Sequence, residues 1–494
     1  MAFQNRFSFN NRSVEKAKEW IDRGKSLGKQ GNYVEAIACY DKAIKVVPND
    51  STIWTLKGSA LKNLSRTTEA IACFDKAIEV EPSSAIAWTL KGNVLSDSGN
   101  FPGAIECYDK AIELNPTNSV ANNKRQAATL ALQKLVEVYE WNNRGLSNYN
   151  QRKYEEAIDC FDEAIAIDST MIHGWINKGV ALSDSGQFIE AIDCYNRVIE
   201  LDPYDEGAWT GKVSALCSLG NIAEAIACVD RAIELKPTHS SLWYTKGFIL
   251  HEQGYLAEAI ACYDRAITLD PTNVSALNNK GGILQIQGRS YEAIACFDKA
   301  IAQDSMNPHS WSNKGTVYTG MGRFDEAIAC LDRAIALDPT CACTWNNRGG
   351  ALAKRGNYSE AVMCYDRAIA LDPTYISARN NKGQVFIDNG NFLEAIVCSD
   401  DAIALAPENA VAWHNKGIAL YLLHQYSEAI AYFDKAIALE TDDVSKAGAW
   451  MNKGNALADL GRFSSAVACY DMAIAIDPTN IDARRNRKLA LSHR

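Results

Sequence analysis

The sequence predicts an all-α solenoid of thirteen helical hairpins. A 34-residue pattern recurs thirteen times, each time with a lysine or arginine immediately before a glycine place. All eleven tryptophans lie four residues before that place, so the copies share one register. A short period of this kind is typical of stacked repeats, which bury their apolar faces against their neighbours. The glycine place holds Gly24, Gly58, Gly92, Gly145, Gly179, Val213, Gly247, Gly281, Gly315, Gly349, Gly383, Gly417 and Gly454.

The first helix of each copy is predicted around the glycine place. In residues 88–99, the residues Trp88, Gly92 and Leu95 recur at three- and four-residue steps. This is the spacing of a helix with one buried face. Gly99 then predicts a tight turn into a second helix, because glycine readily ends a helix in a left-handed conformation.

The second helix follows this turn directly. Ala104, Cys107, Tyr108 and Ala111 recur at steps that place them on one helix face. Pro116 and the polar residues after it end this helix and cap the next one. Each copy is therefore predicted to be an antiparallel helical hairpin.

This pattern of tryptophan, glycine, alanine, an aromatic residue, alanine and proline resembles the tetratricopeptide repeat family. The resemblance covers about nine tenths of the chain. It implies helix pairs stacked into a right-handed superhelix with capping helices at exposed ends. It also implies that the first helices line a concave groove, which in this family usually holds an extended peptide or a partner's helix.

The repeat phase is interrupted between the third and fourth copies. Adding 34 to Gly92 reaches Gln126, whereas the next repeat glycine, Gly145, lies nineteen residues further on. Residues 119–143 contain neither glycine nor proline, so they are predicted to form one long helix. The predicted organisation is an N-terminal tail at 1–16, three repeats with a capping helix at 17–134, and ten repeats with a C-terminal capping helix at 135–494.

Two smaller irregularities occur in the second block. Residues 444–446 are three extra residues, and we expect them in a longer surface loop. Arg379 replaces the tryptophan of its repeat. If it is buried it needs a partner, such as Asp400 or Asp401.

Composition excludes several classes of protein. The net charge is −10 with dispersed charges, so no nucleic-acid partner is expected. No run of 18 apolar residues and no signal-peptide core occur, so we expect a cytoplasmic protein without a membrane partner. Twelve of the fifteen cysteines share one repeat place, fifteen residues after the glycine place. Neighbouring helices lie about 8–10 Å apart, too far for disulfides or a shared metal, so buried reduced thiols and no cofactor are expected.

A cation and an aspartate recur with the repeat. Lys178 and Arg348 are examples of the cation before the glycine place, and the aspartates stand seventeen residues after that place, from Asp41 to Asp471. The cation's stem is predicted to cover the tryptophan ring, with the aspartate as its partner on a second helix. The alternative is a row of cations that binds anions.

An asparagine recurs two places before the glycine place in eight of the ten repeats of the second block. Asparagine is a mediocre residue inside a helix, so this recurrence indicates a role outside helix formation. Its amide offers one acceptor and two donors, which match the backbone of a bound peptide. The candidate peptide-binding residues are Asn143, Asn177, Asn279, Asn313, Asn347, Asn381, Asn415 and Asn452.

These eight residues, which we call the asparagine ladder, are similar to the asparagines in the repeat arm of O-linked N-acetylglucosamine transferase. That resemblance implies that they hold a substrate backbone inside the superhelix. The alternative is that the amides cross-link neighbouring first helices, or were copied with the repeats. A chaperone-type carboxylate clamp is not expected, because its starting lysine is missing three places before every repeat glycine.

The predicted function is a non-catalytic scaffold that binds an extended protein or peptide segment in the concave groove. No stretch longer than about twenty residues lies outside the repeats, so a catalytic domain is not expected. Two alternatives remain. The chain is a self-associating assembly element, and so a homo-oligomer, or it is the targeting arm of a separate catalytic subunit such as a glycosyltransferase.

Overall fold

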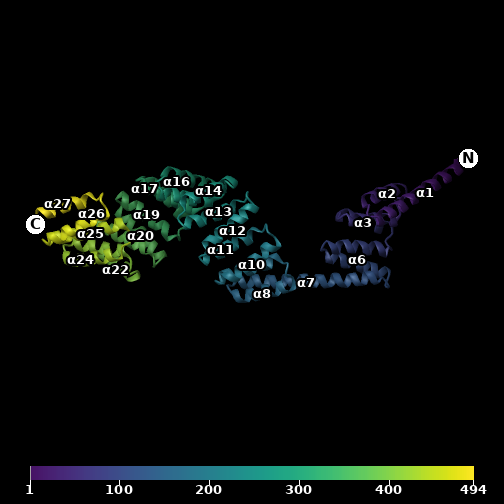
Figure 1. Cartoon of the computed structure of the whole chain (residues 1–494), viewed down its shortest axis with the longest axis horizontal. Coiled ribbons are helices and arrows are strands. Elements are labelled where there is room, and N and C mark those ends of the chain that lie inside the picture. The colour runs from purple at the N-terminus through teal and green to yellow at the C-terminus, as the bar shows by residue number, and fades with distance from the viewer. Residues whose placement is uncertain (1, 494) are drawn as a thin grey trace. The chain divides into compact units, whose positions relative to one another are not determined.

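A computed structural model describes residues 2–493, with side chains from residue 14 onward. This range contains 27 α-helices and no strand (Figure 1). The described chain forms two compact units, one ending at Asn221 and the other beginning at Ile222. The predicted all-α repeat fold is confirmed.

The helices have regular lengths in both units. Unit 1 contains α1 (Ala2–Lys29), α2 (Tyr33–Val46), α3 (Ser51–Asn63), α4 (Thr67–Val80), α5 (Ala85–Asp97), α6 (Phe101–Leu114), α7 (Ser119–Asn150), α8 (Tyr154–Ile167), α9 (Ile172–Asp184), α10 (Phe188–Leu201) and α11 (Glu206–Ser218). Unit 2 contains α12 (Ile222–Leu235), α13 (Ser240–Glu252), α14 (Leu256–Leu269), α15 (Val274–Ile286), α16 (Ser290–Gln303), α17 (Pro308–Gly320), α18 (Phe324–Leu337), α19 (Ala342–Arg355), α20 (Tyr358–Leu371), α21 (Ile376–Asp388), α22 (Phe392–Leu405), α23 (Ala410–Leu422), α24 (Tyr426–Leu439), α25 (Asp443–Asp459), α26 (Phe463–Ile476) and α27 (Ile481–Ser492). Odd-numbered helices up to α25 are first helices of repeats, and the even-numbered helices are second helices.

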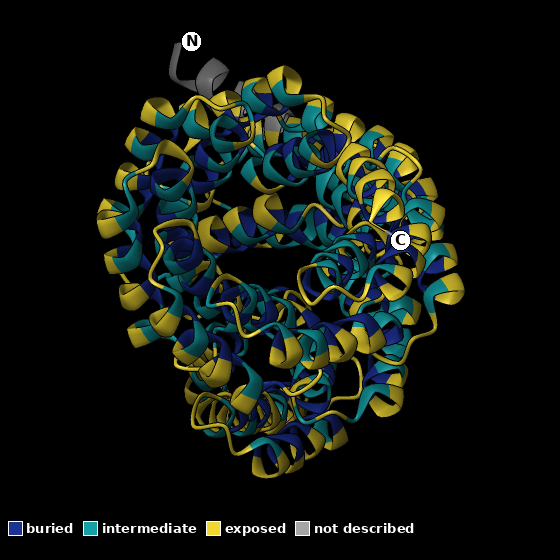
Figure 2. Ribbon diagram, turned by 90° about the vertical axis from the view of Figure 1, so that its left-hand side faces the viewer, coloured by how far each residue is buried: buried dark blue, intermediate teal, exposed yellow. Residues whose placement is uncertain are grey.

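In most hairpins, an aromatic side chain of the second helix packs on the repeat glycine, whereas Gly315 meets Leu331 and Gly383 meets no aromatic ring. At Gly281 of α15, a Cβ atom would lie 2.6 Å from Cε1 of Phe297 in α16. Only hydrogen fits there, and Phe297 is fully buried. Buried faces turn toward neighbouring helices and exposed faces turn to solvent (Figure 2).

The tryptophans fix the turn between consecutive repeats. In Trp54, the indole N–H donates a hydrogen bond of 2.9 Å to the Pro48 carbonyl, six residues earlier. The same bond is made, at 2.8–3.2 Å, by Trp88, Trp175, Trp209, Trp243, Trp311, Trp345 and Trp413. Each indole therefore anchors its own first helix to the preceding turn.

The cations before the glycine place join consecutive repeats. Lys314 Nζ lies 2.6 Å from Asp298 Oδ1 of the preceding second helix and 5.9 Å from the centre of the Trp311 ring. The predicted partnership is confirmed in Lys57–Asp41, Lys91–Asp75, Lys178–Asp162, Lys246–Asp230, Lys280–Asp264, Lys314–Asp298, Arg348–Asp332, Lys382–Asp366, Lys416–Asp400 and Lys453–Asp434.

The twelve cysteines at the common repeat place are all buried. No disulfide joins any cysteines within the described residues. Burial raises the pKa of Cys107 and Cys194 to about 11. These thiols are therefore protonated near neutral pH.

The long helix predicted across the phase interruption is α7, with 32 residues. Ala121 and Ala128 in its first half pack on Tyr108 of α6, and Gly145 in its second half packs on Phe161 of α8. Between these contacts, residues 133–137 are all exposed. We call residues 133–137 the bare stretch, because no neighbouring helix covers them. The predicted block boundary at 134/135 falls within it and stays a prediction.

Three local features differ from the expectations. Residues 444–446 lie in the first turn of α25, because the Asp442 carboxylate caps the helix by accepting from the Ser445 N–H at 2.8 Å. Arg379 donates to the Tyr375 carbonyl at 3.5 Å, whereas Asp400 is held by Lys416. The predicted tail at 1–16 is helical from Ala2 as part of α1, and its side chains up to residue 13 lie outside the described ones.

Candidate functional site

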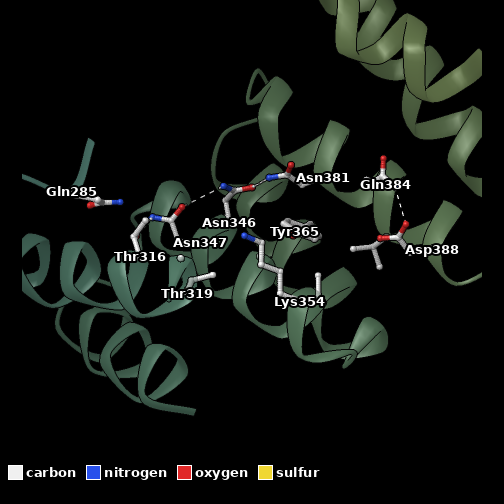
Figure 3. A pocket seen from close by; sticks show the side chains of 14 residues that line it. Gln285, Thr316, Thr319, Asn346, Asn347, Lys354, Tyr365, Asn381, Gln384 and Asp388 are labelled. Atoms are coloured by element: carbon white, nitrogen blue, oxygen red, sulfur yellow. Dashed lines mark hydrogen bonds between the residues drawn. The ribbon is translucent and has the colours of Figure 1, made fainter. Parts of the chain in front are cut away.

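A cavity of about 520 Å³ opens on the first helices of unit 2 (Figure 3). Its lining comes from four consecutive first helices, α15, α17, α19 and α21, together with Tyr365 of α20. Burial raises the pKa of Tyr365, so its hydroxyl stays neutral. The cavity therefore crosses four neighbouring repeats on the side of their first helices.

Two asparagines of the ladder lie in this cavity. Asn347 Nδ2 donates to Thr316 Oγ1 on the preceding first helix at 3.3 Å. Asn381 Nδ2 donates to Asn346 Oδ1 at 2.9 Å, and the Asn381 side chain is exposed. Each primary amide has a second N–H, so both residues keep a donor for another partner.

The two charged residues in the cavity lining have opposite signs. Lys354 is exposed, and its side chain points toward Asn346 and Asn347 (Figure 3). No carboxylate of the described chain pairs with it. Asp388 lines the cavity too and accepts a hydrogen bond from Gln384 at 2.8 Å. An uncommitted ammonium group is therefore available to an acidic group of a ligand.

Outside the cavity, the asparagine ladder makes one recurring contact in both units. Asn177 Nδ2 donates to Asn142 Oδ1 at 2.9 Å, and Asn279 Nδ2 donates to the Tyr244 hydroxyl at 3.3 Å. Each acceptor stands three places before the preceding repeat glycine. The ladder therefore links neighbouring first helices, which is one of the two roles that the sequence allows.

The last two asparagines of the ladder make the same link with different acceptors. Asn415 is 5% exposed and donates to the Asn380 carbonyl at 3.2 Å. Asn452 Nδ2 lies 3.0 Å from His414 Nε2. Burial lowers the pKa of His414, so its ring is neutral near pH 7 and can accept this bond.

Asn143 and Asn313 form no such link. Asn143 is exposed on α7, and Asn313 is half-buried on α17. Neither side chain hydrogen-bonds to another residue of the described chain. The eight asparagines are therefore not equivalent: six join helices, two do not, and the cavity brings together Asn347 and Asn381.

Two buried acceptors lie beside the ladder. The side-chain oxygens of Asn278 and Asn380 have no hydrogen-bond partner among the described residues. Both amide groups donate instead, Asn278 to Ser310 at 2.9 Å and Asn380 to Asn409 at 3.0 Å. Beside the ladder, two buried amide oxygens therefore accept no hydrogen bond from the repeats themselves.

Several other cavity residues were missed by the sequence reasoning, among them Gln285, Thr316, Lys354, Gln384 and Asp388. Thr316 and Gln384 stand three residues after the ladder place, and Gln285, Lys354 and Asp388 stand six or seven residues after it. These are the steps of one helix face. Residues three, six and seven places after each ladder asparagine lie on the same helix face, and this spacing is the signal that would have found them.

No group of three or more histidine, cysteine, aspartate or glutamate side chains is arranged to hold a metal ion in the described part of the chain. Among the described helices, none has the length and apolarity needed to cross a lipid bilayer.

Several solved structures are similar to this chain. Yeast Tom70 is 17% identical, covers 90% of this chain and 96% of its own, and has a TM-score of 0.42. Cut9, in a Cut9–Hcn1 hetero-tetramer of the APC/C, is 16% identical with 97% of each chain covered and a TM-score of 0.44. YrrB, described as a tetratricopeptide repeat protein with an unusual peptide-binding site, is 26% identical over 38% of this chain and 97% of its own, with a TM-score of 0.32.

Family models give the assignment. No curated protein matches the chain significantly. One model described as the tetratricopeptide repeat matches residues 17–50, 85–118, 138–171, 173–205, 308–341, 410–443 and 447–480. Two further models of the repeat match residues 247–288 and 349–390, and residues 51–84, 207–239, 274–305 and 376–409. Because these matches cover most of residues 17–480 in the register of the observed hairpins, the chain belongs to the tetratricopeptide repeat family.

Proposed function

We propose that this chain is a protein-interaction scaffold that holds an extended segment of a partner along the first helices of unit 2. Membership of the tetratricopeptide repeat family supports the scaffold role in general. The observation that carries the finer proposal is the cavity across α15, α17, α19 and α21. It contains the amides of Asn347 and Asn381, and both retain unused polar groups.

The spacing of the ladder fits an extended chain. Neighbouring first helices lie about 8–10 Å apart, and an extended peptide advances about 3.3 Å per residue. One asparagine can therefore bind roughly every third residue of the ligand. The six ladder residues from Asn279 to Asn452 then follow about fifteen to eighteen residues of the partner.

Amides and charges have different roles in this proposal. The second N–H and the carbonyl oxygen of an asparagine match backbone groups of any sequence, so they supply affinity with little preference. Lys354 gives the site a sequence preference, because an unpaired cation favours an acidic side chain or a terminal carboxylate at that point of the ligand. The bound segment is therefore expected to carry an acidic group opposite α19.

Affinity capture with matched variants tests the proposal. The triple variant Asn313→Ala, Asn347→Ala, Asn381→Ala removes the two cavity amides of the ladder and the unlinked amide of Asn313, but it also removes two links between helices. Lys354→Gln changes the cavity and breaks no ion pair of the described chain. The control is Asn143→Ala, which changes the same repeat place on α7, outside the cavity. All variants are first matched for helicity and melting temperature.

Wild type and Asn143→Ala are expected to capture the same partners from host lysate. The triple variant and Lys354→Gln are expected to lose them by about tenfold or more, which corresponds to 1.4 kcal/mol. Equal capture by all four proteins would instead show that the cavity is not the binding site and that the ladder only joins helices.

A second candidate function is self-association, favoured by one specific observation. On α7, Leu130, Leu135, Val136 and Tyr139 are exposed, with Tyr139 at 56%. This part of the helix has no second helix beside it, because the repeat phase is interrupted there. Exposed apolar residues that lie close together often mark an interface. If self-association is the function, the triple variant keeps the wild-type sedimentation behaviour, and Leu135→Glu loses the associated species.

A further inference from the structure

Two cysteines stand apart from the twelve buried ones. Cys341 and Cys343 flank Ala342 at the start of α19, where Cys341 is the N-cap residue. Cys341 is half-buried and Cys343 is exposed. Their Sγ atoms lie only 2.8 Å apart. The repeat pattern does not account for this pair, because neither residue is at the common cysteine place.

The two thiols are chemically different. Partial burial disfavours the Cys341 thiolate, but hydrogen bonds from the Cys343 thiol and from Thr344 outweigh burial and lower the pKa of Cys341. Desolvation and the neighbouring Cys341 raise the pKa of Cys343 to about 11. The first backbone N–H groups of α19 also favour negative charge at Cys341. Of the two, Cys341 is the better nucleophile and Cys343 holds the proton.

The backbone allows the two sulfur atoms to bond. Residues on either side of one helical residue have Cα atoms about 5.4 Å apart, from the rise and radius of the α-helix. Disulfides form when the Cα atoms are about 4.4–6.8 Å apart. With both Sγ atoms already in contact, ring closure needs side-chain adjustment and no movement of a neighbouring helix.

We propose that Cys341 and Cys343 form a thiol–disulfide exchange site that takes a low-molecular-weight disulfide as its substrate. Nothing in the tetratricopeptide repeat pattern requires this chemistry. The proposal rests on the contact between two sulfur atoms, their access to solvent, which the twelve buried cysteines lack, and their position at a helix N-terminus. It does not depend on partner binding in the cavity.

The exchange has two steps. The Cys341 thiolate attacks one sulfur of R–S–S–R, so a Cys341–S–SR bond forms while the original disulfide breaks and releases RS⁻, which takes a proton from water. Cys343 then loses its proton, and its sulfur attacks Cys341 Sγ and displaces the second RS⁻. The protein dithiol loses two electrons and two protons, and the small disulfide is reduced to two thiols.

Peptide mapping of the whole chain gives a direct test. Trypsin releases residues 334–348 as one peptide, which contains Cys341, Cys343 and no other cysteine. The fully reduced protein is treated with oxidised glutathione near neutral pH, quenched with acid and digested. We expect this peptide to lose two hydrogen atoms without gaining glutathione. The half-buried Cys217 is the internal comparison and should remain reduced.

Variants separate the two roles. Cys343→Ser should stop at the first step and retain one glutathione on Cys341. Cys341→Ser should react about tenfold more slowly or less, because it leaves the thiol with the smaller thiolate fraction. Cys217→Ser is the matched control and should behave as wild type. The wild-type peptide is read without any substitution, so the test holds even if a variant folds poorly.

Three results would overturn the proposal. The first is a wild-type peptide 334–348 that stays reduced while Cys217 reacts. The second is a wild-type peptide that keeps glutathione instead of closing, which would remove the role given to Cys343. The third is equal reactivity of Cys341→Ser and Cys343→Ser, which would show that the two thiols act independently.

Discussion

At the scale of single residues, two adjacent glycines differ in the space available for a side chain. Gly281 and Gly282 are adjacent in α15 and both are helical. A Cβ atom on Gly281 would collide with Phe297, whereas a Cβ atom on Gly282 would meet nothing within 4 Å. The repeat sequence predicts the first glycine, because it recurs in phase. The open space at Gly282 could not be predicted, since it depends on which side chains the neighbouring repeats supply.

The first prediction compares these two glycines. Gly281→Ala should lower the free energy of unfolding by about 1–3 kcal/mol, because Phe297 must move out of a packed position. Gly282→Ala should raise it by up to about 1 kcal/mol, because alanine favours the helix and meets no atom. Urea denaturation followed by circular dichroism measures both. Equal shifts in the two variants would contradict the packing assigned to Phe297.

The asparagine ladder marks the limit of sequence reasoning at this scale. The sequence identifies the amides and leaves open whether they bind a ligand or join helices. It does not show that Asn177 and Asn381 donate to asparagines 35 residues earlier. Those contacts depend on how adjacent first helices face each other. The two charged cavity residues, Lys354 and Asp388, were missed for the same reason, because only the assembled cavity shows which residues line it.

At the scale of elements, α7 differs from every other first helix. Its first half packs on α6, and its second half is the first helix of the fourth repeat and packs on α8. Its bare central stretch, residues 133–137, has no helix beside it. The missing glycine and proline predict this continuous helix. The helical start of residues 444–446 could not be predicted from phase alone, because it depends on capping by Asp442.

The second prediction concerns local opening of α7. A protease cuts where a segment can unfold without disrupting a packed core. Brief trypsin treatment should therefore cut first after Lys134, which lies in the bare stretch and is exposed. Mass spectrometry of the first two fragments should give residues 1–134 and 135–494. First cuts within the packed hairpins would contradict the predicted block boundary.

At the scale of the whole molecule, the fold followed from the sequence almost completely. Thirteen copies of one pattern repeat the same signals, so an error at one position is corrected by the others. The all-α repeat fold, the buried cysteines and the partners of the cations are confirmed for this reason. The irregular Arg379 was not predictable, because its repeat departs from the pattern and its contact has no counterpart in other copies.

The third prediction concerns acid stability and arises from a turn that recurs along the chain. The carboxylates of Asp338, Asp372 and Asp477 each accept from the hydroxyl and backbone N–H of a threonine two residues later. These bonds lower the pKa of all three aspartates below the ordinary value. Their stabilisation is therefore present above about pH 4 and is lost as pH falls through the lowered values.

Melting temperatures measured by circular dichroism at a series of pH values check this. The wild type should lose melting temperature steadily as pH falls below about 4. A triple variant, Asp338→Asn, Asp372→Asn and Asp477→Asn, should start lower and lose less over the same range. Parallel curves for the two proteins would show that these turns do not link protonation to unfolding.

The buried cysteines give nearly every repeat its own chemical label. A thiol shielded inside a closed hairpin cannot meet a bulky alkylating reagent, so it reacts only while that hairpin is open. The twelve thiols lie at one place in twelve different repeats. Pulse labelling in mild denaturant followed by peptide mapping would therefore report the opening of each repeat separately. The wild-type chain already contains what is needed to determine where unfolding begins and in which direction it spreads.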